Sequence, residues 1–313
     1  MRALRTATFT ESVIREMTRL ANQHEAINLA QGFPDFPMPD PMKDAACAAI
    51  HGDINQYAIT WGAPPLRVAV AEKYRRWYEM DVDPEREITV TCGATEAMAS
   101  AFLALFDPGD EVVVLEPFYE NYGPDAILAA ASPVFVPLEM PNWRLDPDRL
   151  RKAFSSRTRA IVVNTPHNPT GRVFTKEEIS LIAELCITHD AWAITDEIYE
   201  HIRYAGGHHP IATWPGMRER TVTISGLSKT FSCTGWRLGY AIAPAEQSQA
   251  IRKVHDFLTV GAPAPLQAAG AVGMAFGPDY YNHIALDYRA RRDVIVHALE
   301  EAGFKISIPE GAY

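Results

Sequence analysis

The sequence predicts an α/β fold in which a mostly parallel sheet is covered by helices on both faces. Short apolar runs alternate with longer amphipathic segments through most of the chain, and this alternation is typical of strands that connect through helices. The length of 313 residues and the hydrophobic content of 47% are those of a core-forming soluble protein.

Each predicted element follows from its pattern. Short apolar runs predict seven strands, at 87–91, 111–115, 134–137, 160–163, 192–195, 221–225 and 238–243. Amphipathic stretches between or after them predict helices at 95–106, 122–131, 147–154, 176–188 and 245–258. A longer helical pattern over 280–302, followed by the apolar run 304–308, indicates a second and smaller unit that begins near residue 280.

Charge and composition exclude several classes of protein. The net charge of -10 argues against a protein that binds a nucleic-acid backbone, and the basic group at 289–292 is typical of a solvated helix face. The sequence has no apolar run long enough to span a bilayer and no apolar segment typical of a secretory signal near Met1. We therefore expect a cytoplasmic protein without membrane or nucleic-acid partners.

The cysteines and histidines do not predict a metal site. The four cysteines are widely spaced and form no Cys-x-x-Cys pair, which favours reduced thiols over a zinc site or disulfides. They are Cys47, Cys92, Cys186 and Cys233. His201 and the pair His208-His209 also lack the spacing typical of metal ligands.

Four polar clusters follow predicted strands directly. They are 93–96, 164–171, 196–199 and 225–229. Because parallel strands end at the same edge of a sheet, where such folds bind ligands, we expect these clusters to converge.

A lone lysine stands in the last of these clusters. Lys229 lies among small and hydroxyl residues, just after the apolar run 221–224, and the glycine-flanked Arg237 follows eight positions later. A buried amine tends to lose its charge and to act as a nucleophile toward a carbonyl, and a planar guanidinium suits a phosphate. The alternative is an ordinary exposed lysine, because Ser-x-x-Ser-Lys is a common pattern.

The first cluster predicts a phosphate site. Gly93, Ala94 and Thr95 would present free backbone N–H groups at a helix N-terminus, where an anion is favoured. The alternative is a simple helix start, capped by Thr91 or Thr95.

Three further residues complete a possible cofactor set. Asp196 ends an apolar strand, so its carboxylate would need a cationic or donor partner, although a helix N-cap is the alternative. Tyr199 would lie one helical turn further on and, with the amide of Asn168, could donate to a phenolate oxygen; a core tyrosine and a simple turn are the alternatives. Phe118 could stack on a planar ring, although an aromatic after a strand is more often part of the core.

Together these groups point to pyridoxal 5'-phosphate. They offer a phosphate turn and arginine, a ring-stacking aromatic, a carboxylate for a ring nitrogen, two donors for a phenolate and an imine-forming lysine. Among common cofactors, this one uses the full set.

The chain resembles the class I/II aminotransferases of fold type I. The resemblance runs from Gln31-Gly-Phe-Pro-Asp-Phe36 to Pro309-Glu-Gly-Ala-Tyr313 and includes the spacings from Asn168 to Asp196 to Tyr199 and from Lys229 to Arg237. The motif Thr165-Pro-His-Asn-Pro-Thr-Gly171 and the first motif resemble the branch of kynurenine, methionine and succinyldiaminopimelate aminotransferases. A three-layer large domain and a smaller α+β domain are implied.

The resemblance implies roles for the central residues. Lys229 would hold the cofactor as an internal aldimine and would shuttle a proton, and Asp196 would bind the pyridine nitrogen. Asn168 and Tyr199 would bind the phenolate oxygen, and Phe118 would cover the ring. The phosphate would be held by Gly93, Ala94, Thr95 and Arg237.

The resemblance also implies contacts around this centre. Tyr57 would reach the cofactor phosphate of the neighbouring subunit in a homodimer, whereas Gly32 and Asn168 would lie near the substrate carboxylate. The expected parts are an N-terminal arm with part of the small domain over 1–42, a large cofactor-binding domain over 43–280 and the start of the small domain over 281–313. In the family, the arginine that binds the substrate carboxylate lies beyond the position of Tyr313, so we expect an incomplete small domain and poor amino transfer.

The sequence thus predicts an enzyme of amino-acid metabolism that transfers an amino group from an L-amino acid to a 2-oxo acid by a ping-pong mechanism. A carbon-sulfur β-lyase on the same fold is one alternative, and release of ammonia and pyruvate without an added oxo acid would distinguish it. A non-catalytic regulatory module that binds the cofactor is another, although such a regulator would need a basic DNA-binding domain. The sequence does not name the amino donor or the acceptor.

Overall fold

The structure, a computed structural model that describes residues 3–312, confirms the predicted α/β fold. Met1, Arg2 and Tyr313 lie outside the described residues. The first predicted part begins at Met1, and the last predicted part and the last motif end at Tyr313. Seven strands form one sheet in the order β1-β7-β6-β5-β4-β2-β3. Strand β7 pairs antiparallel with β1 and β6, and the other pairs are parallel. The strands are β1 (Ile88–Thr91), β2 (Glu111–Glu116), β3 (Ser132–Pro137), β4 (Thr158–Asn164), β5 (Trp192–Asp196), β6 (Thr221–Gly226) and β7 (Gly239–Ile242).

All seven predicted strands and six predicted helices are present, with ends that differ by up to about three residues. Four helices were not predicted, namely α1 (Val13–Gln23), α2 (Asp40–His51), α3 (Pro64–Tyr78) and α9 (Ala264–Met274). The predicted helices are α4 (Ala94–Leu105), α5 (Tyr122–Leu128), α6 (Pro147–Ala153), α7 (Lys176–Thr188), α8 (Ala245–Thr259) and α10 (Pro278–Glu301). The helix considered at 196–199 was wrong: the residues after Asp196 form a turn.

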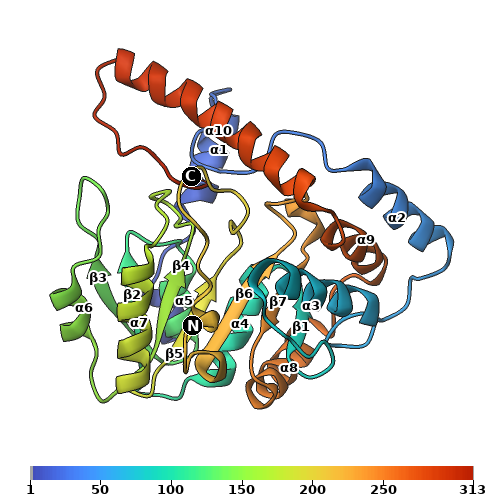
Figure 1. Cartoon of the computed structure of the whole chain (residues 1–313), viewed down its shortest axis with the longest axis horizontal. Helices are drawn as coiled ribbons and strands as arrows, with labels where there is room; N and C mark the ends of the chain where they lie inside the picture. The colour runs from blue at the N-terminus through green and yellow to red at the C-terminus, as the bar shows by residue number, and fades with distance from the viewer. Residues whose placement is uncertain (1–2, 313) are drawn as a thin grey trace.

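Alternating side chains of the strands enter separate hydrophobic cores on the two faces of the sheet. In β2, Val112 and Val114 pack with α4 and α5, whereas Val113 and Leu115 pack with α6 and α7. A strand that is buried on both faces reads as a continuous apolar run, which is why β2 was recognised in the sequence. The result is three layers, with the sheet between helices (Figure 1).

The N-terminal segment and α10 lie outside these layers. Helix α10 crosses above the sheet (Figure 1), and Tyr281 and Ile284 are its buried residues. The segment after it, 304–308, forms no strand. Within residues 3–312, no helix combines the length and apolar character needed to cross a membrane.

Candidate active site

Lys229 lies in the turn after β6, at the edge of the sheet where the parallel strands end. Its Nζ donates a hydrogen bond to the Gly32 carbonyl over 2.9 Å and lies 5.8 Å from the centre of the Tyr199 ring. Burial lowers the pKa of Lys229 to about 8; nearby Arg237 also lowers it, while Asp196 opposes the change. Since a neutral amine is nucleophilic, Lys229 can attack a carbonyl near neutral pH.

Asp196 ends β5 and keeps part of its bonding capacity for a ligand. Its Oδ2 accepts a hydrogen bond from the Tyr122 hydroxyl at 2.8 Å, and its Oδ1 accepts one from the Ile198 N–H at 3.3 Å. Burial raises the pKa of Asp196 to about 6. A buried carboxylate of this kind is stabilised by a cationic donor, and the second bond caps a turn rather than the helix that the sequence alternative supposed.

The cluster after β4 meets the one after β5, as expected. Asn164 pairs with Asp196 in the sheet register, and its side chain bonds to both segments. Its Nδ2 donates to the Asp196 carbonyl over 2.8 Å, and its Oδ1 accepts from the Asn168 N–H at 2.6 Å. Asn164 therefore fixes the loop that carries Asn168 beside the strand end, and Tyr199 is buried in the adjacent turn.

Gly93 and Arg237 form an anion cradle at the start of α4. Gly93 has φ +85°, and a Cβ there would lie 2.5 Å from Arg237 Nη2, so only glycine fits. Neither Thr91 nor Thr95 caps this helix, which leaves the first N–H groups, near Ala94 and Thr95, for an outside acceptor. Within the described residues, Arg237 is exposed and no carboxylate lies within 4.0 Å of it.

These residues fit pyridoxal 5'-phosphate. The cradle offers a guanidinium and uncapped N–H groups to a phosphate. The Asp196 carboxylate suits a protonated ring nitrogen, and Lys229 suits an aldehyde. These groups also lie close together, because they come from the carboxyl ends of parallel strands and from the start of α4.

The positions of Phe118 and its neighbour Tyr119 bear on the expectation that Phe118 covers the cofactor ring. The Phe118 ring stacks on Phe135 of β3, with 5.1 Å between ring centres and 4° between ring planes. Tyr119 instead lies near Asp196 and Thr95: burial raises its pKa, Asp196 raises it further, and a hydrogen bond with Thr95 opposes the rise. Of these two aromatic residues, Tyr119 is the one that lies beside residues of the strand-end clusters.

Tyr57 lies in the loop between α2 and α3, away from the buried groups above. Its side chain is 86% exposed. Gly32 is also exposed, although its carbonyl accepts the hydrogen bond from Lys229.

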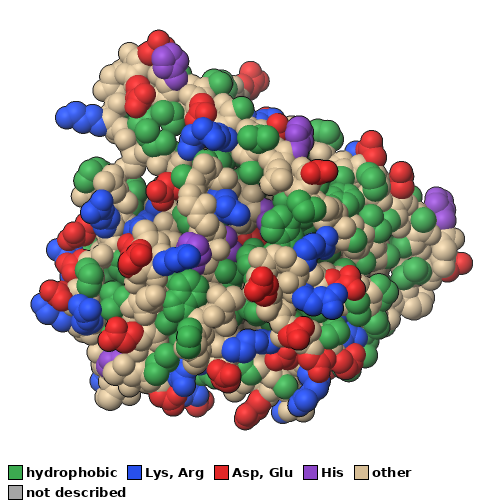
Figure 2. Space-filling model, viewed as in Figure 1, with side chains coloured by type: hydrophobic (Ala, Val, Ile, Leu, Met, Phe, Trp, Pro, Cys, Tyr) green, Lys and Arg blue, Asp and Glu red, His purple; other side chains and the backbone are tan. Residues whose placement is uncertain are grey.

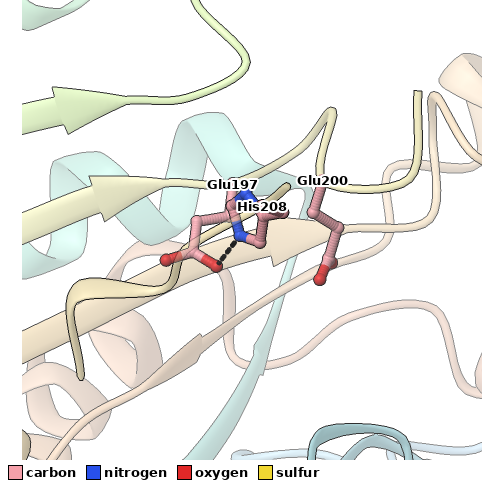
Figure 3. Close-up of side chains that lie close together, drawn as sticks. All are labelled: Glu197, Glu200 and His208. Carbon is pink, nitrogen blue, oxygen red and sulfur yellow. Dashed lines mark hydrogen bonds and ion pairs between the residues drawn. The ribbon is translucent and has the colours of Figure 1, made fainter. Parts of the chain in front are cut away.

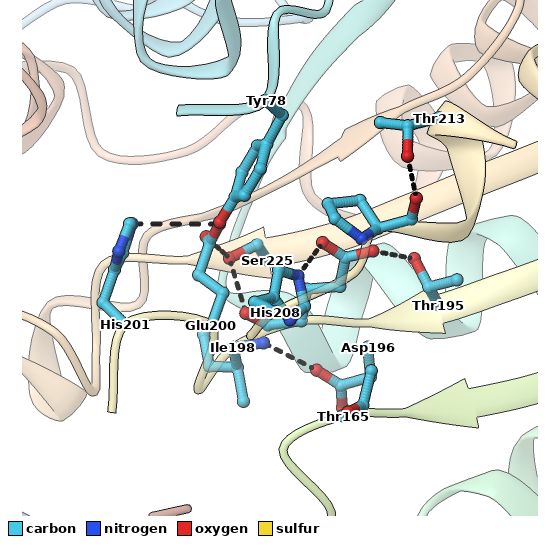
Figure 4. A network of polar contacts seen from close by, with 12 residues as sticks. Tyr78, Thr165, Thr195, Asp196, Ile198, Glu200, His201, His208, Thr213 and Ser225 are labelled. Carbon is cyan, nitrogen blue, oxygen red and sulfur yellow. Dashed lines mark hydrogen bonds and ion pairs between the residues drawn. The ribbon is translucent and has the colours of Figure 1, made fainter. Parts of the chain in front are cut away.

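A buried charged network lies directly behind Asp196. Glu200 forms an ion pair with Lys73 of α3. It also accepts hydrogen bonds from the hydroxyls of Tyr78 and Ser225 (Figure 4). Glu197 accepts from His208 Nε2 at 2.7 Å (Figure 3). Apart from two glutamates close to Asp196, no sequence pattern indicated this network, since its other members come from distant segments.

Glu197, Glu200 and His208 bring potential metal-ligand atoms within 4.8 Å of one another (Figure 3). The histidine spacing in the sequence did not reveal this grouping. Both carboxylates are already bonded, Glu200 to the Lys73 ammonium and Glu197 to His208 and to the Thr195 hydroxyl at 2.9 Å. We therefore assign no metal ion to the cluster.

Comparison with known proteins gives consistent matches. The sequence profile of the family "Aminotransferase class I and II" matches residues 24–313. Kynurenine–oxoglutarate transaminase 1 of Homo sapiens is 40% identical, over 95% of this chain and 76% of its own length. Methionine aminotransferase of Escherichia coli K12 is 39% identical, over 96% of this chain and 78% of its own. The structure of N-succinyldiaminopimelate aminotransferase from Mycobacterium tuberculosis matches with a TM-score of 0.98 and 42% identity, covering 100% of this chain and 82% of that one.

Proposed function

The chain belongs to the class I and II aminotransferases, which depend on pyridoxal 5'-phosphate, and we propose that its strand-end cluster transfers an amino group from an L-amino acid to a 2-oxo acid. The observation that carries this assignment is Lys229, a half-buried amine that lies at the strand ends, bonded to the Gly32 carbonyl, and whose pKa falls to about 8. When bound, the cofactor supplies an aldehyde that condenses with an amine and a ring that withdraws electrons from the substrate α carbon.

The residues of this chain would divide the work as follows. The neutral Lys229 amine would bind the aldehyde and, once the substrate amine has displaced it, the freed amine would take a proton from the substrate α carbon. Asp196, aligned by Tyr122, accepts a hydrogen bond from the ring nitrogen and holds its proton in place. Asn168 and Tyr199 donate to the phenolate oxygen.

The phosphate and the ring face have their own proposed partners. Arg237 and the N–H groups of Ala94 and Thr95 hold the phosphate, and Gly93, whose own N–H donates to the Thr91 carbonyl at 2.8 Å, gives the turn room for it. We propose that Tyr119, rather than Phe118, covers the ring, because the face of Phe118 is engaged with Phe135. Gly32 and Asn168 remain the proposed contacts of the substrate carboxylate.

We also propose a homodimer in which Tyr57 serves the neighbouring site. Tyr57 is 86% exposed and Phe257 is 92% exposed, and large exposed aromatics favour a protein partner. Thr60, three residues after Tyr57, bonds to α8, so the Tyr57 loop and the Phe257 end of α8 belong to one region. Further apolar side chains gather at the upper right of the face drawn in Figure 2, where α2 and α9 lie in Figure 1.

We propose a cytoplasmic location for the protein and a division of the chain into three parts. The four cysteines are free, which supports a cytoplasmic, reducing location. We retain the three parts 1–42, 43–280 and 281–313, because the buried sheet and its flanking helices fall within the second of them.

Activity is tested with Lys229→Ala. Wild-type protein loaded with the cofactor is expected to transfer amino groups to 2-oxoglutarate from a panel of donors that includes kynurenine and methionine, the substrates named in its relatives. The variant should keep its circular dichroism spectrum and lose transfer with every donor. Unchanged transfer by the variant would contradict the assignment.

A further inference from the structure

His255 of α8 connects two parts of the molecule that the sequence keeps far apart. Its side chain has no exposed surface. Nδ1 lies 2.7 Å from Glu96 Oε1, in the first turn of α4. Nε2 lies 2.9 Å from the Thr60 carbonyl oxygen, in the loop that carries Tyr57.

Both ring nitrogens of His255 must donate. A carbonyl oxygen only accepts, so Nε2 carries a proton toward Thr60. Glu96 accepts hydrogen bonds from the Cys92 N–H at 2.6 Å and from the Ser100 hydroxyl at 3.1 Å, as an ionised carboxylate does. Nδ1 thus faces an acceptor as well, and the geometry of both ring nitrogens suits a buried imidazolium.

The electrostatics agree with this geometry. Burial opposes the charged form, but the hydrogen bond and charge of Glu96, together with the Thr60 carbonyl, raise the pKa of His255 above its ordinary value. Thr259 Oγ1, 3.2 Å from Nδ1, and the nearby Asp256 carboxylate are the other polar groups beside the ring.

Each end of the imidazolium reaches a part of a proposed phosphate site. The Glu96 carboxylate accepts a hydrogen bond from the Cys92 N–H, and Glu96 itself lies in the first turn of α4. It therefore contacts the chain just before the turn at 93–95 and belongs to the helix just after it. Thr60 lies three residues after Tyr57, and its hydroxyl also bonds to Asp256 of α8 at 3.4 Å. The end of α8 thus fixes the phosphate turn and the Tyr57 loop relative to each other.

We propose that His255 is a positioning residue that aligns the phosphate turn of its own subunit with the tyrosine that serves the other subunit's site. One buried side chain would then support both cofactor sites of the dimer. The inference rests on the proposed homodimer with shared sites.

Mixed dimers separate the two effects of His255. One subunit is wild type, and its partner carries Lys229→Ala, so borohydride can fix the cofactor only on the wild-type subunit. Four partner subunits are compared: one carries Lys229→Ala alone, and the other three also carry Tyr57→Phe, His255→Gln or His297→Gln. His297→Gln is the matched control, because His297 pairs with Glu301 at 3.2 Å on the surface.

The cofactor dissociation constant of the wild-type site is the readout. Tyr57→Phe and His255→Gln in the partner should each weaken binding by about tenfold, whereas His297→Gln should not change it. An effect of Tyr57→Phe without one of His255→Gln overturns the role of His255 and leaves the shared site intact. No effect of Tyr57→Phe overturns the shared site itself, and with it the link proposed for His255.

The reverse arrangement tests the phosphate turn of the same subunit. His255→Gln is placed in the subunit with the intact lysine, and Lys229→Ala stands alone in the partner. Binding should again weaken by about tenfold. Wild-type affinity here would overturn the proposed alignment of the turn.

A measurement on the wild-type protein does not depend on how the variants fold. Nitrogen NMR of histidine-labelled holoenzyme should show protons on both ring nitrogens of His255 at neutral pH, with the His255→Gln spectrum used only for assignment. A single protonated nitrogen would overturn the doubly donating arrangement.

Discussion

Two lysines in this protein, the buried Lys73 and the half-buried Lys229, have opposite electrostatic environments. Lys73 meets the Glu200 carboxylate and the Tyr240 hydroxyl, the latter at 3.1 Å, and its pKa is raised above the ordinary value because Glu200 outweighs the effect of burial. Lys229 meets a backbone carbonyl of Gly32, and burial lowers its pKa to about 8. Both amines lose water, but only one gains a carboxylate in contact.

The same contrast extends to the regions around them. Behind Asp196, the charges of Lys73 and Glu200 satisfy each other inside the protein. At the strand ends, no carboxylate among the described residues lies within 4.0 Å of the Arg237 guanidinium. We conclude that paired buried charges here hold the fold, whereas the charges left without a counterion are arranged for a ligand.

The largest expected effect is on stability, and it tests the first half of this contrast. Lys73→Met should lower the free energy of unfolding by about 3–5 kcal/mol, because Glu200 would remain buried without its counterion. Lys229→Met should leave that free energy unchanged or raise it. Urea unfolding of the apoprotein measures both.

A surface pair provides the control. Lys43 pairs with Asp40 at 2.8 Å on an exposed part of α2, so Lys43→Met should change the free energy of unfolding by less than about 1 kcal/mol. Equal losses for Lys73→Met and Lys43→Met would contradict the structural role of the buried pair.

The next effect is on catalysis. Asp196→Asn keeps the shape of the side chain and removes its charge, so kcat should fall by about 10²- to 10³-fold while the cofactor still binds. Single-turnover rates measure this change directly. Rates near those of the wild type would favour a purely structural role, in which Asp196 caps the turn through Ile198.

The pKa of Lys229 gives a third expectation. Below about pH 8 most of the amine is protonated, and its reactive neutral fraction falls about tenfold with each pH unit. The rate constant for covalent loading should therefore rise by about tenfold per pH unit and level off above that pH. Stopped-flow absorbance measures the rate. A plateau reached only above pH 10, as for an ordinary lysine, would contradict the assigned effect of burial.

The smallest effect concerns the alignment of Asp196. Tyr122→Phe removes one hydrogen bond to the carboxylate and should lower kcat by a few-fold to about tenfold. Tyr119→Phe keeps the ring that we propose stacks on the cofactor and serves as the comparison. A larger loss in Tyr119→Phe than in Tyr122→Phe would contradict this ranking.

Local patterns predicted much of this arrangement. Strands buried on both faces produce continuous apolar runs, and the polar residues after them, such as Asn168, Asp196 and Lys229, converge because parallel strands end together. Helix α9 was missed because its small residues give a weak amphipathic pattern.

Contacts between distant segments were not predictable in this way. The ion pair of Lys73 with Glu200 and the bond of His255 with Glu96 join residues more than 100 positions apart, and no periodicity encodes them. Whether Phe118 or Tyr119 faces the cluster depends on the path of one loop, which the sequence pattern leaves open.

The central claim is that, of the two lysines compared, Lys229 is the one that reacts, because among the described residues no carboxylate lies within 4.0 Å of its amine, whereas Lys73 is paired with Glu200. Wild-type protein is loaded with pyridoxal 5'-phosphate, reduced with borohydride and digested, and the modified lysine is identified by mass spectrometry. We predict modification at Lys229 and none at Lys73. A stoichiometric adduct on Lys73 or another lysine, with Lys229 unmodified, would contradict the account.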